Sequence, residues 1–147
     1  MAHTFLLQSG KWLLEGTWLE LKQQPIAVKG KTMINWSKDD WFDMATKLVF
    51  PGSDREGITL IYRGRMGTDD RRFSFVLEHS EVKRVEGEGW IGQSTIVQRF
   101  WALNDKQMRT GFETLYQKDQ NTYFLSHSLV SGSCLVSNLE AVLTRTD

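Results

Sequence analysis

Apolar and polar residues alternate along most of this chain, and short polar breaks separate the alternating stretches. Each stretch is rich in β-branched and aromatic residues, and a period of two is typical of strands that bury one face. The stretches are residues 12–23, 27–37, 41–50, 57–66, 70–79, 82–92, 94–103, 108–117, 121–131 and 134–145. The pattern therefore predicts ten β-strands.

The breaks carry turn-forming residues, such as Gln24-Pro25, Gly67-Thr68-Asp69 and Ser131-Gly132-Ser133. No break is long enough for the crossover that a parallel pair needs, so successive strands are expected to be antiparallel neighbours. An open sheet of this size would leave two long edges, whereas an up-and-down barrel removes them. We therefore expect an all-β, up-and-down antiparallel barrel of about ten strands. A two-sheet sandwich is the alternative, and it needs longer connections.

The first residues do not follow the strand pattern. Phe5, Leu6 and Leu7 lie within residues 3–8, and Gly10 stands where a helix would end, which predicts a short N-terminal helix or 3₁₀ turn. Such a segment would plug one end of the barrel, with His3 in solvent. The chain has no internal repeat, low-complexity tract or linker, so residues 1–147 are expected to form a single domain.

Composition excludes several classes of protein. The 147 residues include 18 Lys and Arg and 18 Asp and Glu, which indicates neither a nucleic-acid surface nor a polybasic membrane patch. With one cysteine, Cys134, and three histidines, neither a disulfide nor a zinc cluster is expected, and Cys134 is predicted to be a half-buried, unreactive thiol. The N-terminus does not match a signal peptide, and no apolar run is long enough for a membrane span, so we expect a cytoplasmic protein without membrane insertion.

One short motif carries a family resemblance. Gly16-Thr17-Trp18 follows the N-terminal turn, and Arg145 lies in the last predicted strand. This arrangement resembles the opening motif of the calycin barrels, which include lipocalins and fatty-acid-binding proteins. The resemblance implies that the Arg145 guanidinium stacks across the Trp18 ring and so latches the last strand to the first.

The chain departs from the larger calycin families in three places. No helix follows the last strand, no lid helices separate the first two strands, and Thr146-Asp147 stands where fatty-acid-binding proteins complete an Arg-x-Tyr site. The resemblance therefore narrows to compact barrels such as nitrobindin-like haem proteins and bilin-lyase-like proteins, which implies haem or bilin as a candidate cofactor. Leu19-Glu20-Leu21 does not match the nitrobindin opening, which argues against haem.

The resemblance to calycins assigns an inward face to the first strand only. If Trp18 points inward, alternation places Trp12, Leu14, Gly16 and Glu20 on the same face. The faces of the other strands cannot be assigned from sequence. Their aromatic residues would either fill the lumen or line a cavity, and we expect a cavity because lumen width grows with strand number. The candidate lumen aromatics are Tyr62, Phe75, Trp101, Phe112 and Tyr116.

Arg99 is the most informative charged residue, because it stands between Val97 and Trp101 in an otherwise apolar strand. On the inner face it would bind the carboxylate head group of a ligand by a bidentate contact. On the outer face its stem would cover apolar surface. Glu140 and Asn138 in the last strand are candidate partners of Arg99.

Two histidines and a glycine pair complete the candidate chemistry. His127 lies in an apolar strand and His79 ends another, and either imidazole would serve as a haem ligand, as an acid or base, or as a structural hydrogen-bonding group. Gly87-Glu88-Gly89 lacks the Gly-Lys-Ser/Thr tail of a phosphate loop, so it predicts a β-bulge or tight bend.

The sequence thus predicts a barrel that binds a hydrophobic or amphipathic small molecule in its lumen, fatty-acid-like, haem-like or bilin-like. An enzyme or chromophore lyase using Arg99, His127, Glu140 or Tyr116 is one alternative, although no catalytic motif is present. An interaction module with a filled lumen is another. The predicted ligand-binding residues are Arg99, Trp101, Tyr116, Phe112, Phe75, Tyr62, His127 and Glu140.

Overall fold

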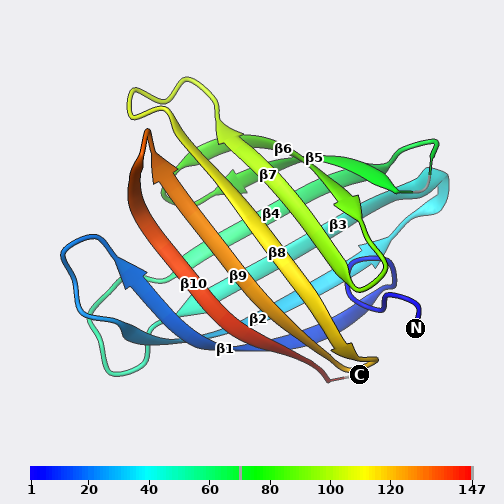
Figure 1. The fold of residues 1–147 in the computed structure, drawn as a ribbon, viewed down its shortest axis with the longest axis horizontal. Helices are drawn as coiled ribbons and strands as arrows, with labels where there is room; N and C mark the ends of the chain where they lie inside the picture. The colour runs from blue at the N-terminus through cyan, green and yellow to red at the C-terminus, as the bar shows by residue number, and fades with distance from the viewer. Residues whose placement is uncertain (70, 147) are drawn as a thin grey trace.

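Ten antiparallel strands make up most of the structure, a computed structural model that describes residues 1–69 and 71–146 (Figure 1). A short 3₁₀ turn, Lys38–Asp40, lies between the second and third strands. The strands are β1 (Gly10–Glu20), β2 (Ile26–Trp36), β3 (Trp41–Val49), β4 (Ile58–Met66), β5 (Arg72–His79), β6 (Lys83–Ile91), β7 (Thr95–Ala102), β8 (Arg109–Asp119), β9 (Thr122–Ser131) and β10 (Cys134–Arg145).

The strands form a closed barrel in which each strand pairs with its neighbours in sequence and β1 pairs with β10. The closing register runs from the pair Trp12 and Arg145 to the pair Glu20 and Ser137. Closure satisfies the backbone groups that an open meander would leave on two edges. The predicted barrel is therefore confirmed, and the two-sheet alternative is excluded.

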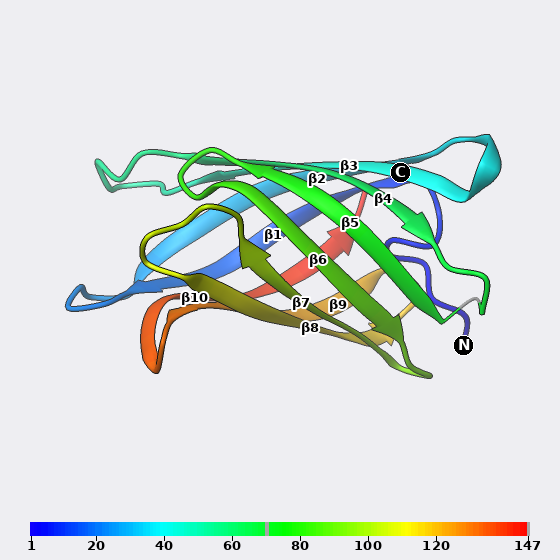
Figure 2. The same ribbon diagram turned by 90° about the horizontal axis from the view of Figure 1, so that it is seen from above.

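The N-terminal segment plugs one end of the barrel as a turn, not as a helix. Residues 5–7 form the turn, and Phe5 and Leu6 are buried in the core. The segment lies at the same end as both termini (Figures 1 and 2). His3 is also buried there, so its predicted place in solvent is wrong. Its Nε2 donates to the carbonyl of Gly92 at 2.9 Å, and its Nδ1 accepts from the Tyr123 hydroxyl at 2.7 Å.

Alternate residues of every strand point into the core, and the β1 register confirms the inward face expected for Trp12, Leu14 and Trp18. Gly87 and Gly89 also face inward on β6, where the pairing with β5 and β7 runs without a register shift. The predicted bulge is therefore wrong. These glycines leave room for the rings of Phe75 and Phe73, which occupy the space that a Cβ would need.

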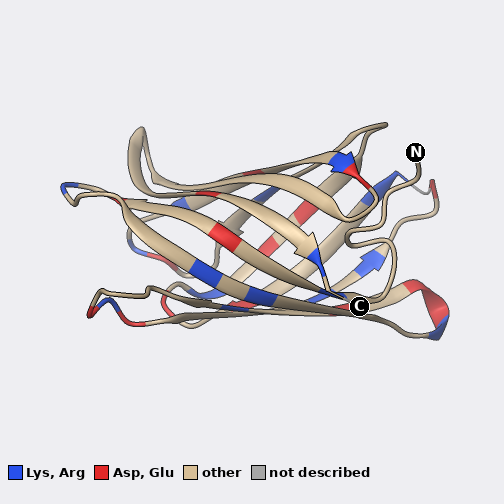
Figure 3. Cartoon of the chain, turned by 90° about the horizontal axis from the view of Figure 1, so that it is seen from below, with Lys and Arg blue, Asp and Glu red and all other residues tan. Residues whose placement is uncertain are grey.

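The outer surface mixes both signs of charge. In the view of Figure 3, Lys and Arg are interspersed with Asp and Glu over the ribbon, and neither sign is gathered on one part of it. Cys134 is a free, exposed cysteine at the start of β10, whereas the sequence predicted a half-buried thiol. No helix within residues 1–69 and 71–146 is long and apolar enough to cross a membrane.

Candidate functional site

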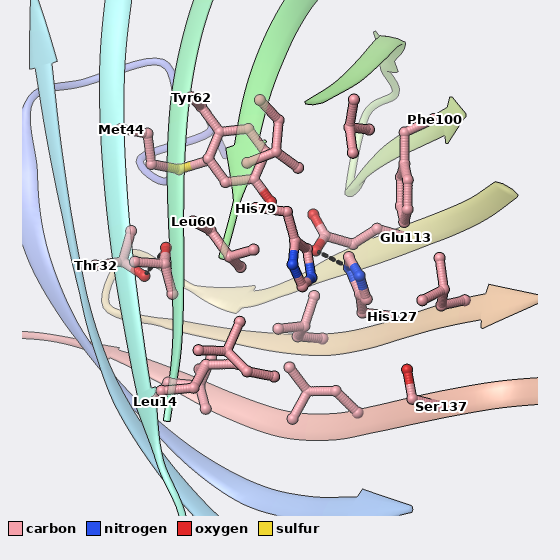
Figure 4. Close-up of a pocket in the computed structure, with 18 of the residues that line it drawn as sticks. Leu14, Thr32, Met44, Leu60, Tyr62, His79, Phe100, Glu113, His127 and Ser137 are labelled. Carbon is pink, nitrogen blue, oxygen red and sulfur yellow. Dashed lines mark hydrogen bonds and ion pairs between the residues drawn. The ribbon is translucent and has the colours of Figure 1, made fainter. Parts of the chain in front are cut away.

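The barrel lumen contains a cavity of about 60 Å³ between the N-terminal plug and the opposite end of the barrel. Its wall is mainly apolar, and Leu14, Trp18, Met44, Leu60 and Leu125 are among the lining residues. A group of polar side chains interrupts this wall, as Figure 4 shows. They are Thr32, Thr46, Tyr62, His79, Glu113, His127 and Ser137.

His127, Glu113 and Gln98 form a hydrogen-bonded chain on the inner wall. Glu113 on β8 is the register partner of both His127 on β9 and Gln98 on β7. His127 Nδ1 donates to Glu113 Oε1 at 2.8 Å, and Gln98 Nε2 donates to Glu113 Oε2 at 2.9 Å. Phe100 stacks on the imidazole with ring centroids 5.0 Å apart. Because an ionised carboxylate only accepts hydrogen bonds, Nδ1 of His127 carries a hydrogen and Nε2 is left for the cavity.

His79, at the end of β5, lies near this chain. The backbone N–H groups of Glu81 and Val82 donate to His79 Nδ1 at 3.0 and 3.1 Å. Since Nδ1 accepts two hydrogen bonds, the hydrogen of the neutral ring lies on Nε2. Burial lowers the pKa of His79 to about 4; the charge of Glu81 opposes this shift, and the charges of Arg109 and Arg55 add to it. His79 is therefore a neutral hydrogen-bond donor at physiological pH.

Tyr62 on β4 supplies the third polar group, and its hydroxyl is directed toward the region of His79 and Glu113 (Figure 4). Burial, and then the charge of Glu113, raises the pKa of Tyr62 well above its usual value, so the hydroxyl keeps its proton. Among the described residues, no hydrogen-bond partner is found for the Tyr62 hydroxyl or for Nε2 of His79 and His127. These three polar atoms are available to a molecule in the cavity.

Arg55, from the connection between β3 and β4, lies over the end of the barrel opposite the plug. Its guanidinium carbon is 5.5 Å from the centroid of Trp18 and 5.1 Å from that of Phe50. Its Nε donates to Glu20 Oε1 at 2.7 Å, and both terminal nitrogens bind the carboxylate of Glu81. Arg55 thus joins β1, its own loop and the β5–β6 turn across the mouth of the barrel.

The charges at the mouth stabilise one another. Burial pushes the pKa of Glu20 upward, but hydrogen bonds from Arg55 and Trp18, together with the Arg55 charge, hold it below its ordinary value. The hydrogen bond to Glu81 is the largest cause of the raised pKa of Arg55. Glu20 and Arg55 are therefore both ionised at neutral pH.

The structure places three of the predicted ligand-binding residues inside the barrel. Tyr62 and His127 line the cavity. Phe75 is buried beside Tyr62, with ring centroids 5.5 Å apart, but it packs over Gly87 in the wall and does not line the cavity.

The other five lie on the outside of the wall, so the prediction that they line the lumen is wrong. Arg99 is 65% exposed, binds Glu88 through Nε and a terminal nitrogen, and stacks on Trp90. The predicted head-group contact inside the barrel therefore fails, and Arg99 has Glu88 as its partner in place of Glu140 or Asn138. The remaining four outward residues are Trp101, Phe112, Tyr116 and Glu140.

The predicted Arg145 and Trp18 contact is also wrong. The register places Arg145 opposite Trp12, at the far end of β1 from Trp18. Arg145 donates to Gln8 Oε1 at 3.1 Å near the plug. The cation on the Trp18 ring is Arg55. The pairing of β1 with β10 closes the barrel. The two strands approach closely at Gly16, where a Cβ would collide with the backbone carbonyl of Glu140.

Sequence reasoning missed Glu113 and Gln98, and it considered His79 without placing it in the site. One signal was present: Glu113 and His127 are nearly equidistant from the turn predicted at residues 118–121, so a tight hairpin sets them opposite each other. Within the described residues, no group of three or more His, Cys, Asp or Glu could hold a metal ion.

Solved structures share this fold at low sequence identity. Rv2717c from M. tuberculosis has a TM-score of 0.75 and 14% identity over 95% of this chain and 92% of that one. The S-type phycobiliprotein lyase CPES from Guillardia theta has a TM-score of 0.66 and 12% identity over 95% of this chain and 88% of that one. No protein-family model and no curated protein matches the sequence.

Identities this low show the fold and not the function. The closed ten-strand antiparallel barrel and its superposition on these two structures agree with the resemblance carried by Gly16-Thr17-Trp18. The chain therefore has a calycin-like barrel fold.

Proposed function

We propose that this protein binds a small amphipathic molecule in the barrel lumen. The observation that carries the proposal is the set of three polar atoms on the apolar cavity wall: the Tyr62 hydroxyl and Nε2 of His79 and His127, none with a hydrogen-bond partner among the described residues. These three atoms are open to the cavity, since the buried side-chain atom without a partner among the described residues is Trp12 Nε1, and a ligand in the cavity can therefore hydrogen-bond to them. A mainly apolar cavity with a few convergent polar groups is typical of small-molecule sites.

The size of the cavity limits the ligand. A free volume of about 60 Å³ holds a few water molecules, whereas sites for drug-sized ligands measure about 300–1,000 Å³. His127 Nε2 has the lone pair that an iron atom needs, but the lumen as it stands has no room for a haem or a bilin. The residues present therefore do not fit either group, and a small ligand is favoured.

A second candidate function, acid–base catalysis, is favoured by the contact between Glu113 and His127. A carboxylate that binds Nδ1 of an imidazole fixes the tautomer and leaves Nε2 free to accept a proton. A substrate would occupy the same lumen, so binding is the first question for both functions. Mass spectrometry of the recovered ligand separates them, because a binding protein returns it unchanged.

Tryptophan fluorescence tests the proposal, because Trp18 lines the cavity. Short-chain acids, alcohols and phenols, with haemin and biliverdin, would be titrated into the protein. We expect saturable quenching by small amphipathic ligands, and loss of that response in Trp18→Phe.

Two substitutions on β10 form a matched pair. Leu139→Phe adds a ring on the inner face, where Leu139 lines the cavity, and Val142→Phe adds the same group on the outer face. Leu139→Phe should abolish binding while its circular dichroism stays that of a folded barrel, and Val142→Phe should bind like the wild type. Equal binding by both variants would place the ligand outside the lumen and overturn the proposal.

A further inference from the structure

We propose that the lumen site takes the carboxylate of a small organic acid, and that His127 takes up one proton from solvent as the acid binds. This inference rests on the proposed function and names the chemistry of its ligand. It is carried by the arrangement of His79, Tyr62 and the His127–Glu113 pair around one cavity (Figure 4).

Two of the polar groups are fixed as neutral donors. The two backbone N–H groups that bind His79 Nδ1 leave the ring hydrogen on Nε2, and the lowered pKa of His79 keeps that ring uncharged. The raised pKa of Tyr62 keeps its O–H. Donors without acceptors favour a ligand that carries acceptor oxygens, and a carboxylate accepts hydrogen bonds through both of its oxygens.

His127 is the group that changes with the ligand. Its Nδ1–H is bound to Glu113, whose second oxygen accepts from Gln98, so Nε2 is the ring atom left for the cavity. A neutral Nε2 presents a lone pair that repels a carboxylate. Once protonated, Nε2–H donates to it in a charge-assisted hydrogen bond.

The charge balance requires the proton. A bound carboxylate would add a second negative charge near Glu113 inside a region of low dielectric, which is costly without a cation between them. The step is RCOO⁻ + H⁺ + neutral His127, giving RCOO⁻ bound to His127–H⁺. The proton comes from solvent, and the site carries one negative charge before and after.

The other charged groups near the site are already paired. Arg109 at the start of β8 binds Asp105 through Nε at 2.9 Å, and Arg55 at the mouth binds two carboxylates. Facing residues of β7 and β10, such as Gln98, Phe100 and Leu139, are uncharged, and Glu140 is on the outer face. His127 is therefore the residue placed to supply the positive charge.

Isothermal titration calorimetry with propionate and 1-propanol, which suit a cavity of about 60 Å³, tests the inference on the unmodified protein. The two probes share an alkyl chain and differ in the head group. The enthalpy is measured at neutral pH in phosphate and in Tris, whose heats of ionisation differ. Propionate should bind with net proton uptake and about tenfold more tightly than propanol, which should take up none.

His127→Gln should remove the proton uptake and weaken propionate about tenfold while leaving propanol nearly unchanged, and Tyr116→Phe on the outer face serves as the control. The proton uptake by the wild type tests the inference even if His127→Gln does not fold. Equal binding of both probes without proton uptake would overturn the inference and leave the proposed function standing. Binding of neither probe, nor of any ligand in the fluorescence panel, would overturn both.

Discussion

Glycines on the inner face of this barrel make room for phenylalanine rings on neighbouring strands. Gly87 and Gly89 lie opposite Phe75 and Phe73, and Gly111 lies opposite Phe100. An aromatic ring that lies flat over a glycine fills the wall without leaving a void, which is how a close-packed interior accommodates residues of unequal size. The same packing keeps these rings from occupying the centre of the lumen.

Gly87→Ala should therefore destabilise the barrel by about 1–3 kcal/mol, because the added methyl would collide with the Phe75 ring and lie 2.7 Å from the carbonyl oxygen of Arg99. Urea unfolding measures the loss, with Thr114→Ala on the outer face as the control. In a Phe75→Leu background the cost should shrink, since the ring is gone. An unchanged cost there would mean that the ring is not the obstacle.

His79 makes stability depend on pH. Burial lowers its folded-state pKa from 6.5 to about 4, so between these values the unfolded chain binds the proton and the folded protein does not. The free energy of unfolding should therefore fall as pH drops from about 6.5 to about 4, by at most about 3 kcal/mol. Urea unfolding at stepped pH measures this loss.

His79→Gln is the comparison for that experiment, because it removes the titrating ring. The variant should lose most of the slope between pH about 5 and 6.5. Asp105, whose pKa its hydrogen bonds with Arg109 lower to about 2, titrates below this window and contributes equally to both proteins. Parallel slopes in the two proteins would mean that His79 is not held neutral by the fold.

The site residues show why strand faces were hard to predict. On β8 the outward positions hold Phe112 and Tyr116, 56% and 50% exposed, while the inward positions hold Gly111 and Glu113. Hydrophobicity alone therefore favours the wrong face. The inward assignment depends on partners from other strands: Phe100 covers Gly111, and His127 binds Glu113. No sequence pattern within one strand contains that information.

At the scale of elements, period-two alternation and turn residues predicted all ten strands, with ends within about three residues of those observed. The N-terminal helix was the exception. Leu6 has a φ of 67°, outside the helical region, and its carbonyl accepts a hydrogen bond from Trp36 Nε1 at 2.7 Å. Tertiary contacts decide the shape of this segment. A prediction from local residues alone therefore gave a helix that the structure does not have.

Tyr123 holds the plug in place. Its hydroxyl binds His3 Nδ1 at 2.7 Å and the backbone N–H groups of Thr4 at 3.1 Å and Phe5 at 3.4 Å. Tyr123→Phe should therefore cost about 1–3 kcal/mol, because it leaves these buried groups without a partner. Tyr116→Phe, on the outer face, should change stability by less than about 0.5 kcal/mol.

Hydrogen exchange gives the local readout for Tyr123→Phe. The amides of Thr4 and Phe5 should lose protection while those in the middle of β4 keep theirs, because the plug opens without the barrel unfolding. Unchanged protection at both amides would show that apolar packing of Phe5 and Leu6 alone seats the plug.

At the scale of the whole molecule, closure and access are set by different groups. Closure comes from the continuous β1–β10 pairing. The number of strands and the short turns between them were enough to predict it from the sequence. We expect access to depend on Arg55, which no alternation pattern singles out because it lies in a loop. Its partners Glu20 and Glu81 come from separate parts of the chain and meet only once the barrel has closed.

Arg55→Ala should open this mouth. The side chain does not line the cavity, so the equilibrium affinity for propionate should change little, while association and dissociation should both speed up by about tenfold. Stopped-flow tryptophan fluorescence measures both rates, and Arg63→Ala, which removes a guanidinium stacked on Trp41 outside the barrel, is the matched control. Rates that are the same in Arg55→Ala and the wild type would mean that ligands enter elsewhere, and the plug end would then be the route to examine.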